Sequence, residues 1–322
     1  MKAPPVLTKP RHLLSVTDLL SQEFCAVIDD AMQTKRHGLQ TQPLVGQSAA
    51  MIFEKPSLRT RVSFEAGLHT LGAHPIYLDH STSRIGERES IPDLAAYLSR
   101  SVSLVIARVH SHAALAELAS HASIPVINAL SDDEHPCQTL ADLLTIKEHV
   151  DQLQGVKIAY VGDGNNVCHS LMLGCALVGA HAIIVTPEGR EPEAKFNTLF
   201  NEIAHETGSE LVVSNATEAL RGCDVVYTDT WVSMGRDESE GSLRAFEAYK
   251  VSTQLMDIAA DGRDEWPLFL HCMPAKRGVE VDSEVIDGPT SIVYDQAENR
   301  MHAQNALMRF LLNPTEESWP RK

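Results

Sequence analysis

The residue types that most favour chemistry lie close together in the segment Ser57-Leu58-Arg59-Thr60-Arg61. This segment follows the apolar run 49–53 and precedes apolar residues at positions 64, 68 and 71, which have helical spacing. Ser57 follows a proline and is a good helix N-cap, so both arginines fall in the first turn. Cations there oppose the helix dipole, which makes sense if a strong anion lies between them. Free amides, hydroxyls and a guanidinium would together hold a phosphate; the alternative is a basic surface turn.

Other polar side chains follow the next two apolar runs. Arg108 ends the run 103–107, and His135 and Gln138 follow the run 125–129. Ligands of open α/β sheets bind at the carboxyl ends of the strands, so we expect these side chains to converge with Arg59 and Thr60. Taken singly, Arg108 has the alternative of a surface cation and His135 that of a helix cap.

Residues Gly162-Asp163-Gly164-Asn165-Asn166 resemble half of a dinucleotide fingerprint, because they follow an apolar run and open a helical segment. Val167 stands where the third glycine would be, so the match fails at the position that packs the helix on the strand. Glu188 lies near the next strand end, where a ribose-binding acid would sit. A nicotinamide dehydrogenase is therefore the alternative function, and it predicts nicotinamide binding at 162–166.

Three further side chains suit an amino-acid substrate or an anion. Asp229 and Cys272 follow the apolar runs 224–227 and 268–271, which places a carboxylate and a thiol at strand ends. Arg300 falls at the start of the last predicted helix, where a cation again suggests a bound anion. The alternatives are a small buried hydrophobe for Cys272 and an exposed side chain for Arg300.

The segments that must position these residues alternate between strands and helices twice along the chain. Apolar runs that predict strands alternate with helical patterns up to residue 129, and a helix at 136–150 leads to a second series. We therefore predict an α/β fold of two doubly wound parallel-sheet domains joined by interdomain helices. A helix is also predicted at 15–38, and the last helix, about 297–312, has no strand after it and is expected to cross back to the first domain.

Composition excludes several classes of protein. The net charge of −16 over 322 residues argues against a nucleic-acid partner, because a phosphate backbone needs a basic footprint. No apolar run approaches the roughly 18 residues of a membrane span, and the N-terminus has no signal core. The six cysteines have no C-x-x-C spacing, so neither zinc nor a disulfide framework is indicated. We expect a cytoplasmic protein.

Four motifs in order along the chain resemble the aspartate/ornithine carbamoyltransferase family. The segment 53–61 is similar to its carbamoyl-phosphate motif, 135–138 to its H-P-x-Q, and 271–274 to its H-C-L-P. Residues 229–235, with Ser-Met-Gly at 233–235, resemble the form of the loop that binds ornithine. Leu58 departs from the usual threonine, which weakens a hydroxyl contact, and Met273 replaces leucine, a volume-conserving change.

The resemblance implies a carbamoyl-phosphate domain at 1–135, completed by the C-terminal helix 297–322, and an ornithine domain at 150–290. It implies carbamoyl phosphate and L-ornithine as substrates, no metal or other cofactor, and a homotrimer in the cytoplasm. Synthesis of arginine and the reverse, catabolic direction both remain open.

The resemblance also implies roles for individual residues. Those implied for carbamoyl phosphate are Ser57, Leu58, Arg59, Thr60, Arg108, His135, Gln138 and Arg300. Those implied for ornithine are Asn166, Asp229, Ser233, Met234, Cys272 and Met273. Arg108, His135, Cys272 and Arg300 would be the catalytic residues among them.

Overall fold

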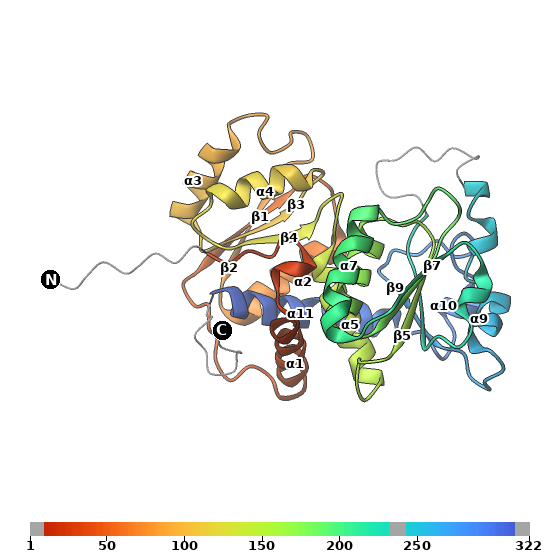
Figure 1. Ribbon diagram of the computed structural model, residues 1–322. Helices are drawn as coiled ribbons and strands as arrows, with labels where there is room; N and C mark the ends of the chain where they lie inside the picture. Colours follow the sequence, from red (N-terminus) through yellow and green to blue (C-terminus); the bar gives the residue numbers. More distant parts are fainter. Residues whose placement is uncertain (1–9, 232–242, 313–322) are drawn as a thin grey trace.

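The computed structural model describes residues 10–231 and 243–312, which form two α/β domains side by side (Figure 1). The first domain holds a parallel sheet in the order β2-β1-β3-β4. Its strands are β1 (Ser48–Phe53), β2 (His74–Asp79), β3 (Leu104–Arg108) and β4 (Val126–Leu130). The second holds a parallel sheet in the order β7-β6-β5-β8-β9. Its strands are β5 (Lys157–Val161), β6 (His181–Val185), β7 (Leu211–Ser214), β8 (Val225–Thr228) and β9 (Leu268–His271).

Helices cover both faces of each sheet, as the alternation in sequence predicts. The α-helices of the first domain and the connection are α1 (Ser21–His37), α2 (Leu58–Leu71), α3 (Ile91–Ser101), α4 (His112–His121) and α5 (Pro136–His149). Those that follow are α6 (Asn166–Val178), α7 (Ala194–Thr207), α9 (Thr253–Ala260), α10 (Ser283–Ile286) and α11 (Val293–Leu312). Short 3-10 turns are η1 (Val16–Asp18), η2 (Thr217–Leu220) and η3 (Glu247–Tyr249). The predicted fold class is confirmed.

One hydrophobic core runs between the two sheets. Met51 and Phe53 of β1 face this core, whereas Ala50 and Ile52 face a separate core under α3 and α4, as expected for the period of two in a strand. In the second sheet Tyr160 faces the shared core and Ala159 the core under α9 and α10. Because α1, α5, α6 and α11 also belong to the shared core, the two domains are packed together over a large apolar area.

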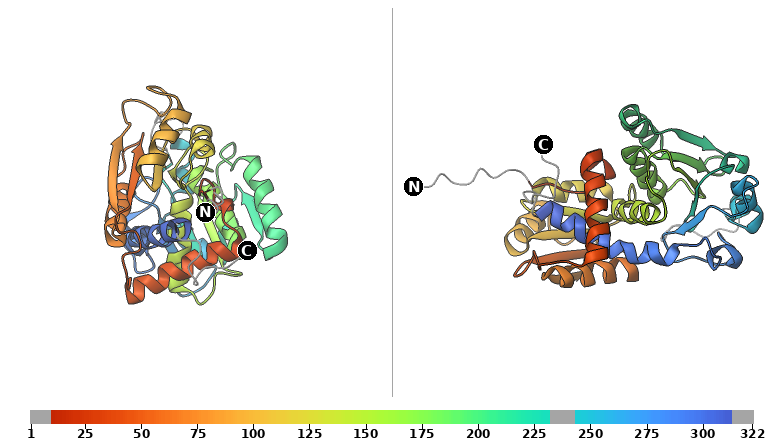
Figure 2. Two further views of the ribbon diagram at one scale, coloured as in Figure 1. Left: turned by 90° about the vertical axis from the view of Figure 1, so that its left-hand side faces the viewer. Right: turned by 90° about the horizontal axis from the view of Figure 1, so that it is seen from below.

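Helix α11 crosses from the second domain back to the first, as predicted (Figure 2). It follows β9 in sequence and packs against α5, α2 and α1. Its bounds differ from the prediction, because it begins at Val293 rather than near residue 297. The buried face carries Gln296, Asn299 and Arg300, and polar residues on a buried face conceal the helical pattern that apolar residues would reveal.

The predicted helix at 15–38 is also corrected. It is divided into η1 and α1 by Leu19 and Leu20, which have extended backbones. Asp18 causes the division, since its carboxylate accepts hydrogen bonds from the backbone N–H groups of Leu14 and Ser15 and closes a capping box around η1.

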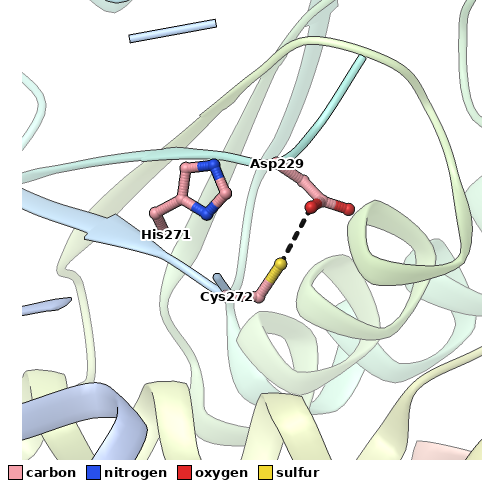
Figure 3. Close-up of side chains that lie close together, drawn as sticks. All are labelled: Asp229, His271 and Cys272. Carbon is pink, nitrogen blue, oxygen red and sulfur yellow. Dashed lines mark hydrogen bonds between the residues drawn. The ribbon is translucent and has the colours of Figure 1, made fainter. Parts of the chain in front are cut away.

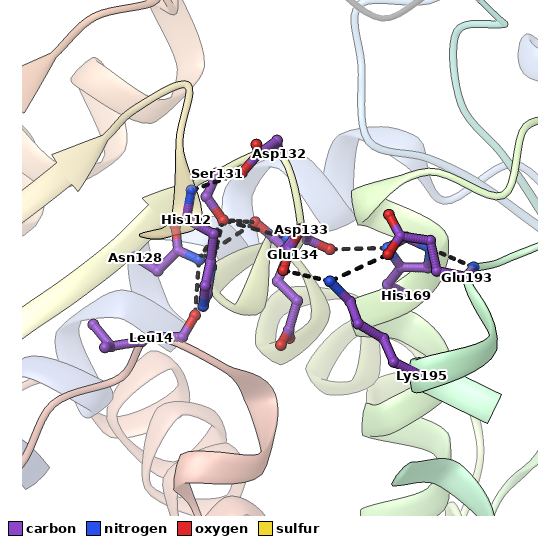
Figure 4. Close-up of polar contacts among 10 residues, drawn as sticks. All are labelled: Leu14, His112, Asn128, Ser131, Asp132, Asp133, Glu134, His169, Glu193 and Lys195. Carbon is purple, nitrogen blue, oxygen red and sulfur yellow. Dashed lines mark hydrogen bonds and ion pairs between the residues drawn. The ribbon is translucent and has the colours of Figure 1, made fainter. Parts of the chain in front are cut away.

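The loop between β4 and α5 is tied to the second domain by polar contacts (Figure 4). Asp133 accepts from Lys195 Nζ at 2.7 Å, and its backbone oxygen lies 2.9 Å from Nδ1 of His169. The other ring nitrogen of His169 accepts from the Glu193 N–H at 3.2 Å, so Nδ1 carries the proton. This loop leads directly into His135, so the contacts fix the start of α5 relative to both sheets.

Within the part of the chain that the structure describes, no helix is both long and apolar enough to cross a membrane.

Gly174 sets the distance between α6 and α5. A Cβ atom there would lie 2.3 Å from Thr139 Cγ2 and 2.9 Å from Leu143 Cδ1, both on α5. Alanine is the better helix former by about 1 kcal/mol, but overpacking a core costs about 1–3 kcal/mol. We expect Gly174→Ala to lower the free energy of unfolding by up to about 2 kcal/mol in urea denaturation. Asn201→Ala on the exposed side of α7 is the control for helix propensity, and a Gly174→Ala protein more stable than wild type would contradict the prediction.

Candidate active site

A cavity of about 720 Å³ lies where the carboxyl ends of both sheets meet. It is reached by the ends of β1 and β3 in the first sheet and of β5 and β8 in the second. These are the neighbouring strands at which the order of each sheet reverses, the usual position of ligand sites in open α/β sheets. The predicted residues that line the cavity are Ser57, Leu58, Arg59, Thr60, Arg108, His135, Gln138, Asn166, Asp229, Cys272, Met273 and Arg300.

Ser57 caps α2, as predicted. Its backbone is extended, its Oγ accepts from the Thr60 N–H at 3.3 Å, and its hydroxyl lies 3.0 Å from Thr60 Oγ1. The first turn of α2 therefore brings two hydroxyls to the cavity together with free N–H groups at the positive end of the helix dipole. An anion is the ligand that this arrangement favours.

Two buried guanidinium groups converge on the same hydroxyl. Arg108 Nη1 lies 3.4 Å and Arg300 Nη2 3.5 Å from Thr60 Oγ1. Burial, and then the charge of Arg300, lower the pKa of Arg108 to about 10, which leaves it cationic at neutral pH. Two buried like charges that approach the same hydroxyl favour binding of an anion between them.

Arg300 reaches this point from the interior of α11. The prediction that it stands at the start of the last helix is wrong, because α11 begins at Val293. The helix dipole therefore gives no reason for a cation at this position. Its position is fixed instead by Gln138, whose Oε1 accepts from Arg300 Nη1 at 2.5 Å.

Of the two arginines in the first turn of α2, only Arg59 lines the cavity. The expectation that an anion lies between Arg59 and Arg61 is wrong. Arg61 Nε donates to Glu65 at 2.8 Å, and its guanidinium lies over the ring of Tyr77. Positions i and i+2 of a helix point in different directions, which explains the difference.

His135 is held rigidly and is neutral. Its backbone N–H donates to Ser170 Oγ at 2.8 Å, and that hydroxyl donates to the buried carboxylate of Glu134 at 3.0 Å. Burial, with the charges of Arg300 and Arg108, lowers the pKa of His135 well below its ordinary value. Its Nδ1 is buried and has no hydrogen-bond partner among residues 10–231 and 243–312. A neutral imidazole has one N–H to donate, which suits polarisation of a ligand oxygen.

The opposite wall of the cavity carries a carboxylate and a thiol (Figure 3). Cys272 Sγ donates to Asp229 Oδ1 at 2.9 Å, and the backbone N–H of Thr230 donates to the same oxygen at 2.7 Å. Asn165 Nδ2 donates to the other oxygen at 3.0 Å. Burial, and then the charge of Asp229, raise the pKa of the Cys272 thiol well above its ordinary value, so the group stays protonated. This wall suits a cationic ligand.

Asp229, His271 and Cys272 place one possible metal ligand each within 4.8 Å of one another. His271 does not fit this role. Its Nδ1 accepts from the Met273 N–H at 2.9 Å, so the proton is on Nε2, which faces Glu280 at 3.3 Å. Because both ring nitrogens are already engaged, His271 supports the loop after β9 and is not free to bind a metal.

The glycines at 162–166 do not form a dinucleotide site. Gly164 donates its N–H to the Arg190 carbonyl at 2.8 Å, and a Cβ atom there would lie 2.4 Å from the Pro192 nitrogen. The glycine thus admits a neighbouring chain segment rather than a pyrophosphate. The residue of this turn that contributes to the cavity wall is Asn165, which caps α6 through Oδ1 and orients Asp229 through Nδ2. The sequence analysis missed this role, although asparagine before a helix is a capping signal.

Asn166 connects the two halves of the cavity, since its Nδ2 donates to the Ser131 carbonyl in the first domain at 2.7 Å. Ser233 and Met234 lie outside the described residues. Three cations that line the cavity, Lys55, Arg84 and Lys276, were not predicted, nor was His110, whose pKa is lowered by burial and by the charges of Lys55 and Arg84. Lys55 directly precedes Pro56 and Ser57, which could have drawn attention to it, whereas the others are isolated in sequence.

The cavity therefore has two chemically different walls. The first domain supplies guanidinium groups, helix amides and a neutral imidazole, which would bind an anion and draw electrons from a carbonyl oxygen. The second domain supplies a carboxylate and a protonated thiol, which would bind an amine. This arrangement suits attack of an amine on a phosphorylated acyl compound.

Comparisons with known proteins agree with this reading. Residues 11–148 match the family model of the aspartate/ornithine carbamoyltransferase carbamoyl-P binding domain, and residues 154–311 match that of the Asp/Orn binding domain. The chain is 48% identical to the ornithine carbamoyltransferase of Methanothermobacter thermautotrophicus over 94% of its length and 99% of that relative. It is 47% identical to that of Carboxydothermus hydrogenoformans, over 94% of this chain and 97% of the relative. The solved ornithine carbamoyltransferase from Pyrococcus furiosus superposes with a TM-score of 0.90 at 40% identity, covering 96% of this chain and 99% of that one.

The contact between Cys272 and Asp229 predicts the reactivity of the thiol. Asp229→Asn removes the charge and the strong acceptor that raise the pKa of Cys272, so more thiolate forms at a given pH. We expect alkylation of Cys272 by iodoacetamide at pH 8 to be slow in the wild type and faster in the variant, as measured by mass spectrometry of the peptide. Asp224→Asn is the control, because Asp224 directly precedes β8 and so lies at the end of that strand opposite Asp229. Equal rates in all three proteins would show that Asp229 does not control the thiol.

Proposed function

Because the chain belongs to the aspartate/ornithine carbamoyltransferase family, we propose that its cavity transfers the carbamoyl group of carbamoyl phosphate to the δ-amine of L-ornithine. The products are citrulline and phosphate, and the reaction belongs to arginine biosynthesis. The observation that carries this proposal is the convergence of Arg108 and Arg300 on Thr60, across one cavity from Asp229 and Cys272. Formation of citrulline from carbamoyl phosphate and ornithine by the purified protein tests it.

We further propose a division of labour between the two domains. Residues 1–135, completed by the C-terminal helix at 297–322, bind carbamoyl phosphate, and residues 150–290 bind ornithine. The position of the anion-binding wall on the first sheet and of the carboxylate on the second supports this division.

The phosphate group is held at the start of α2. Ser57, Arg59, Thr60 and Arg300 contact its oxygens, and Leu58 contributes its backbone N–H, so the loss of the threonine hydroxyl weakens this site without abolishing it. A guanidinium held against a phosphate oxygen is strongest where water is excluded, and it also stabilises phosphate as the leaving group.

The carbamoyl group lies deeper, where Arg108, His135 and Thr60 polarise its oxygen and Gln138 accepts from its nitrogen. The unprotonated δ-amine attacks the carbamoyl carbon, and negative charge develops on the carbamoyl oxygen. The bond from carbon to the bridging oxygen then breaks, phosphate leaves with the electron pair, and the amine loses a proton. Positioning and electrostatic stabilisation supply the acceleration, without a covalent enzyme intermediate.

Ornithine binds along the second wall. Asp229 binds its α-ammonium, Asn166 its α-carboxylate, and Cys272 and Met273 lie beside the side chain. We assign Ser233 and Met234 to closure over the substrate. The hydrogen bonds that Asn165 and Thr230 donate to Asp229 support the role proposed for Asp229, because they hold its carboxylate in one orientation before ornithine binds.

We propose that the protein is a cytoplasmic homotrimer that needs no metal or organic cofactor. The neighbouring apolar side chains of Leu58 and Val62 support a subunit contact near the cavity. Leu58 is 76% and Val62 54% exposed although both are on α2, beside the phosphate site. Exposed apolar groups next to a polar cavity are typical of a surface that another subunit covers.

Arg59 and Arg61 form a matched pair for testing the phosphate site. Arg59→Ala removes a charge-assisted contact worth about 1.5–3 kcal/mol, so the Kd for carbamoyl phosphate should rise by roughly 10- to 150-fold. Arg61→Ala removes the same charge from the same helical turn, but that side chain binds Glu65 and should leave the Kd nearly unchanged. Isothermal titration calorimetry measures both, and equal losses in the two variants would show that net charge rather than contact geometry controls binding.

The choice of amine follows from the second wall. We expect kcat/KM for ornithine to exceed that for N-acetylornithine, putrescine and lysine at saturating carbamoyl phosphate. Acetylation removes the α-ammonium and leaves the Asp229 carboxylate unpaired, putrescine lacks the α-carboxylate, and lysine misplaces the nucleophile by one methylene. The unpaired Asp229 carboxylate should cost a few kcal/mol of binding free energy, and the extra methylene of lysine about 1–3 kcal/mol. If another amine equals ornithine, the assignment of the second wall is wrong even though carbamoyl transfer would stand.

A further inference from the structure

Asp142 is a buried carboxylate one helical turn beyond Gln138 on α5. It is 0% exposed and does not line the cavity. One of its oxygens, Oδ1, accepts two hydrogen bonds: from Gln138 Nε2 at 2.8 Å and from Gln296 Nε2 at 2.6 Å. These two amides, one on α5 and one on α11, satisfy Oδ1, whereas Oδ2 is buried and has no hydrogen-bond partner among the described residues. A buried carboxylate that is bonded at one oxygen only is costly.

The first of these contacts decides which way the Gln138 amide faces. A carboxylate oxygen carries no hydrogen and can only accept, whereas a guanidinium can only donate. The NH₂ group of Gln138 therefore points to Asp142 and its Oε1 to Arg300 Nη1 and the cavity. Burial raises the pKa of Asp142 to about 7. Protonation would place the proton on Oδ2, because Oδ1 is occupied by two donors, and the orientation of Gln138 is kept.

The second contact, with Gln296, connects Asp142 to the strand end that we propose to bind ornithine. Gln296 Oε1 accepts from the backbone N–H of His271 at 2.9 Å, and His271 is followed directly by Cys272. One carboxylate oxygen thus connects the amide that faces the carbamoyl group with the strand end that carries the thiol.

We propose that Asp142 is a positioning residue for the transfer: it sets the amide orientation of Gln138 and, through Gln296, the position of the loop that carries Cys272. This inference rests on the proposed function, in which Gln138 accepts from the carbamoyl nitrogen. Were the amide reversed, its NH₂ group would face both Arg300 and the carbamoyl NH₂, and donors would meet donors.

The test compares Asp142→Ala with Thr145→Val. Thr145 is also buried on α5 and accepts from Asn299 Nδ2 of α11 at 2.9 Å, so its loss removes a hydrogen bond between the same helices without touching Gln138. In citrulline assays we expect Asp142→Ala to lower kcat/KM for carbamoyl phosphate by about 10- to 100-fold, the effect of misplacing a reacting group. Thr145→Val should stay within about threefold of wild type while losing thermal stability.

Two further measurements separate positioning from general weakening of the fold. Asp142→Asn keeps an acceptor at Oδ1 and should recover most of the loss. In a Gln138→Ala background, Asp142→Ala should cost less than about threefold in kcat/KM for carbamoyl phosphate, because the residue that it positions on the carbamoyl side is already gone. If the double variant loses as much kcat/KM as the product of the two single losses, the proposal is overturned.

If Asp142→Ala does not fold, Gln296→Leu provides the decision. It leaves the bond between Asp142 and Gln138 and should raise the KM for ornithine about tenfold with the KM for carbamoyl phosphate nearly unchanged. Equal changes in both would overturn the proposal. A wild-type protein that forms no citrulline would refute the proposed function itself. An active wild type whose Asp142→Ala variant behaves like Thr145→Val would refute only the role of Asp142.

Discussion

The site depends on two buried guanidinium groups that are held beside one hydroxyl. Arg108 and Arg300 both approach the hydroxyl of Thr60, and burial together with their mutual repulsion lowers the pKa of Arg108. Such an arrangement destabilises the ligand-free fold and is compensated when a dianion binds. In a chain with a net charge of −16, it also creates the local positive potential that attracts an anionic substrate. Gln138, which is hydrogen-bonded to Asp142, holds the Arg300 guanidinium in place beside Thr60.

The fold must bring together two cations that lie far apart in the sequence, one on the first sheet and one on the last helix. Arg108 ends β3 in the first sheet, whereas Arg300 is on α11, which begins after the second sheet is complete. The shared core, to which α1, α5, α6 and α11 contribute, fixes the position of α11 relative to β3. The second wall, with Asp229 oriented by Asn165, then faces the cations across the cavity. The charge of each wall thus complements the charge of the substrate group that we propose for it.

Sequence reasoning succeeded where one local signal determined the structure. The apolar run 49–53 lies within β1, and the serine at 57 caps α2, because burial and capping act over a few residues. It failed where distant contacts decide. The Gly164 turn is filled by residues 190–192, and α11 begins earlier than its polar inner face suggests. The error at Arg61 is different, because the direction of positions i and i+2 on a helix is a local rule that was not applied. Asp142 has no signal in the sequence, because only the approach of α11 to α5 gives it partners.

The route of α11 has a consequence for the order of events during synthesis on the ribosome. Residues of both sheets leave the ribosome before Arg300 does, and domains generally begin to fold as units while the chain is still growing. The first sheet can therefore form while the buried face of α2 still lacks its partner helix. The nascent chain holds Arg108 but not the second guanidinium, so the complete anion site appears only when α11 docks across the assembled pair of sheets.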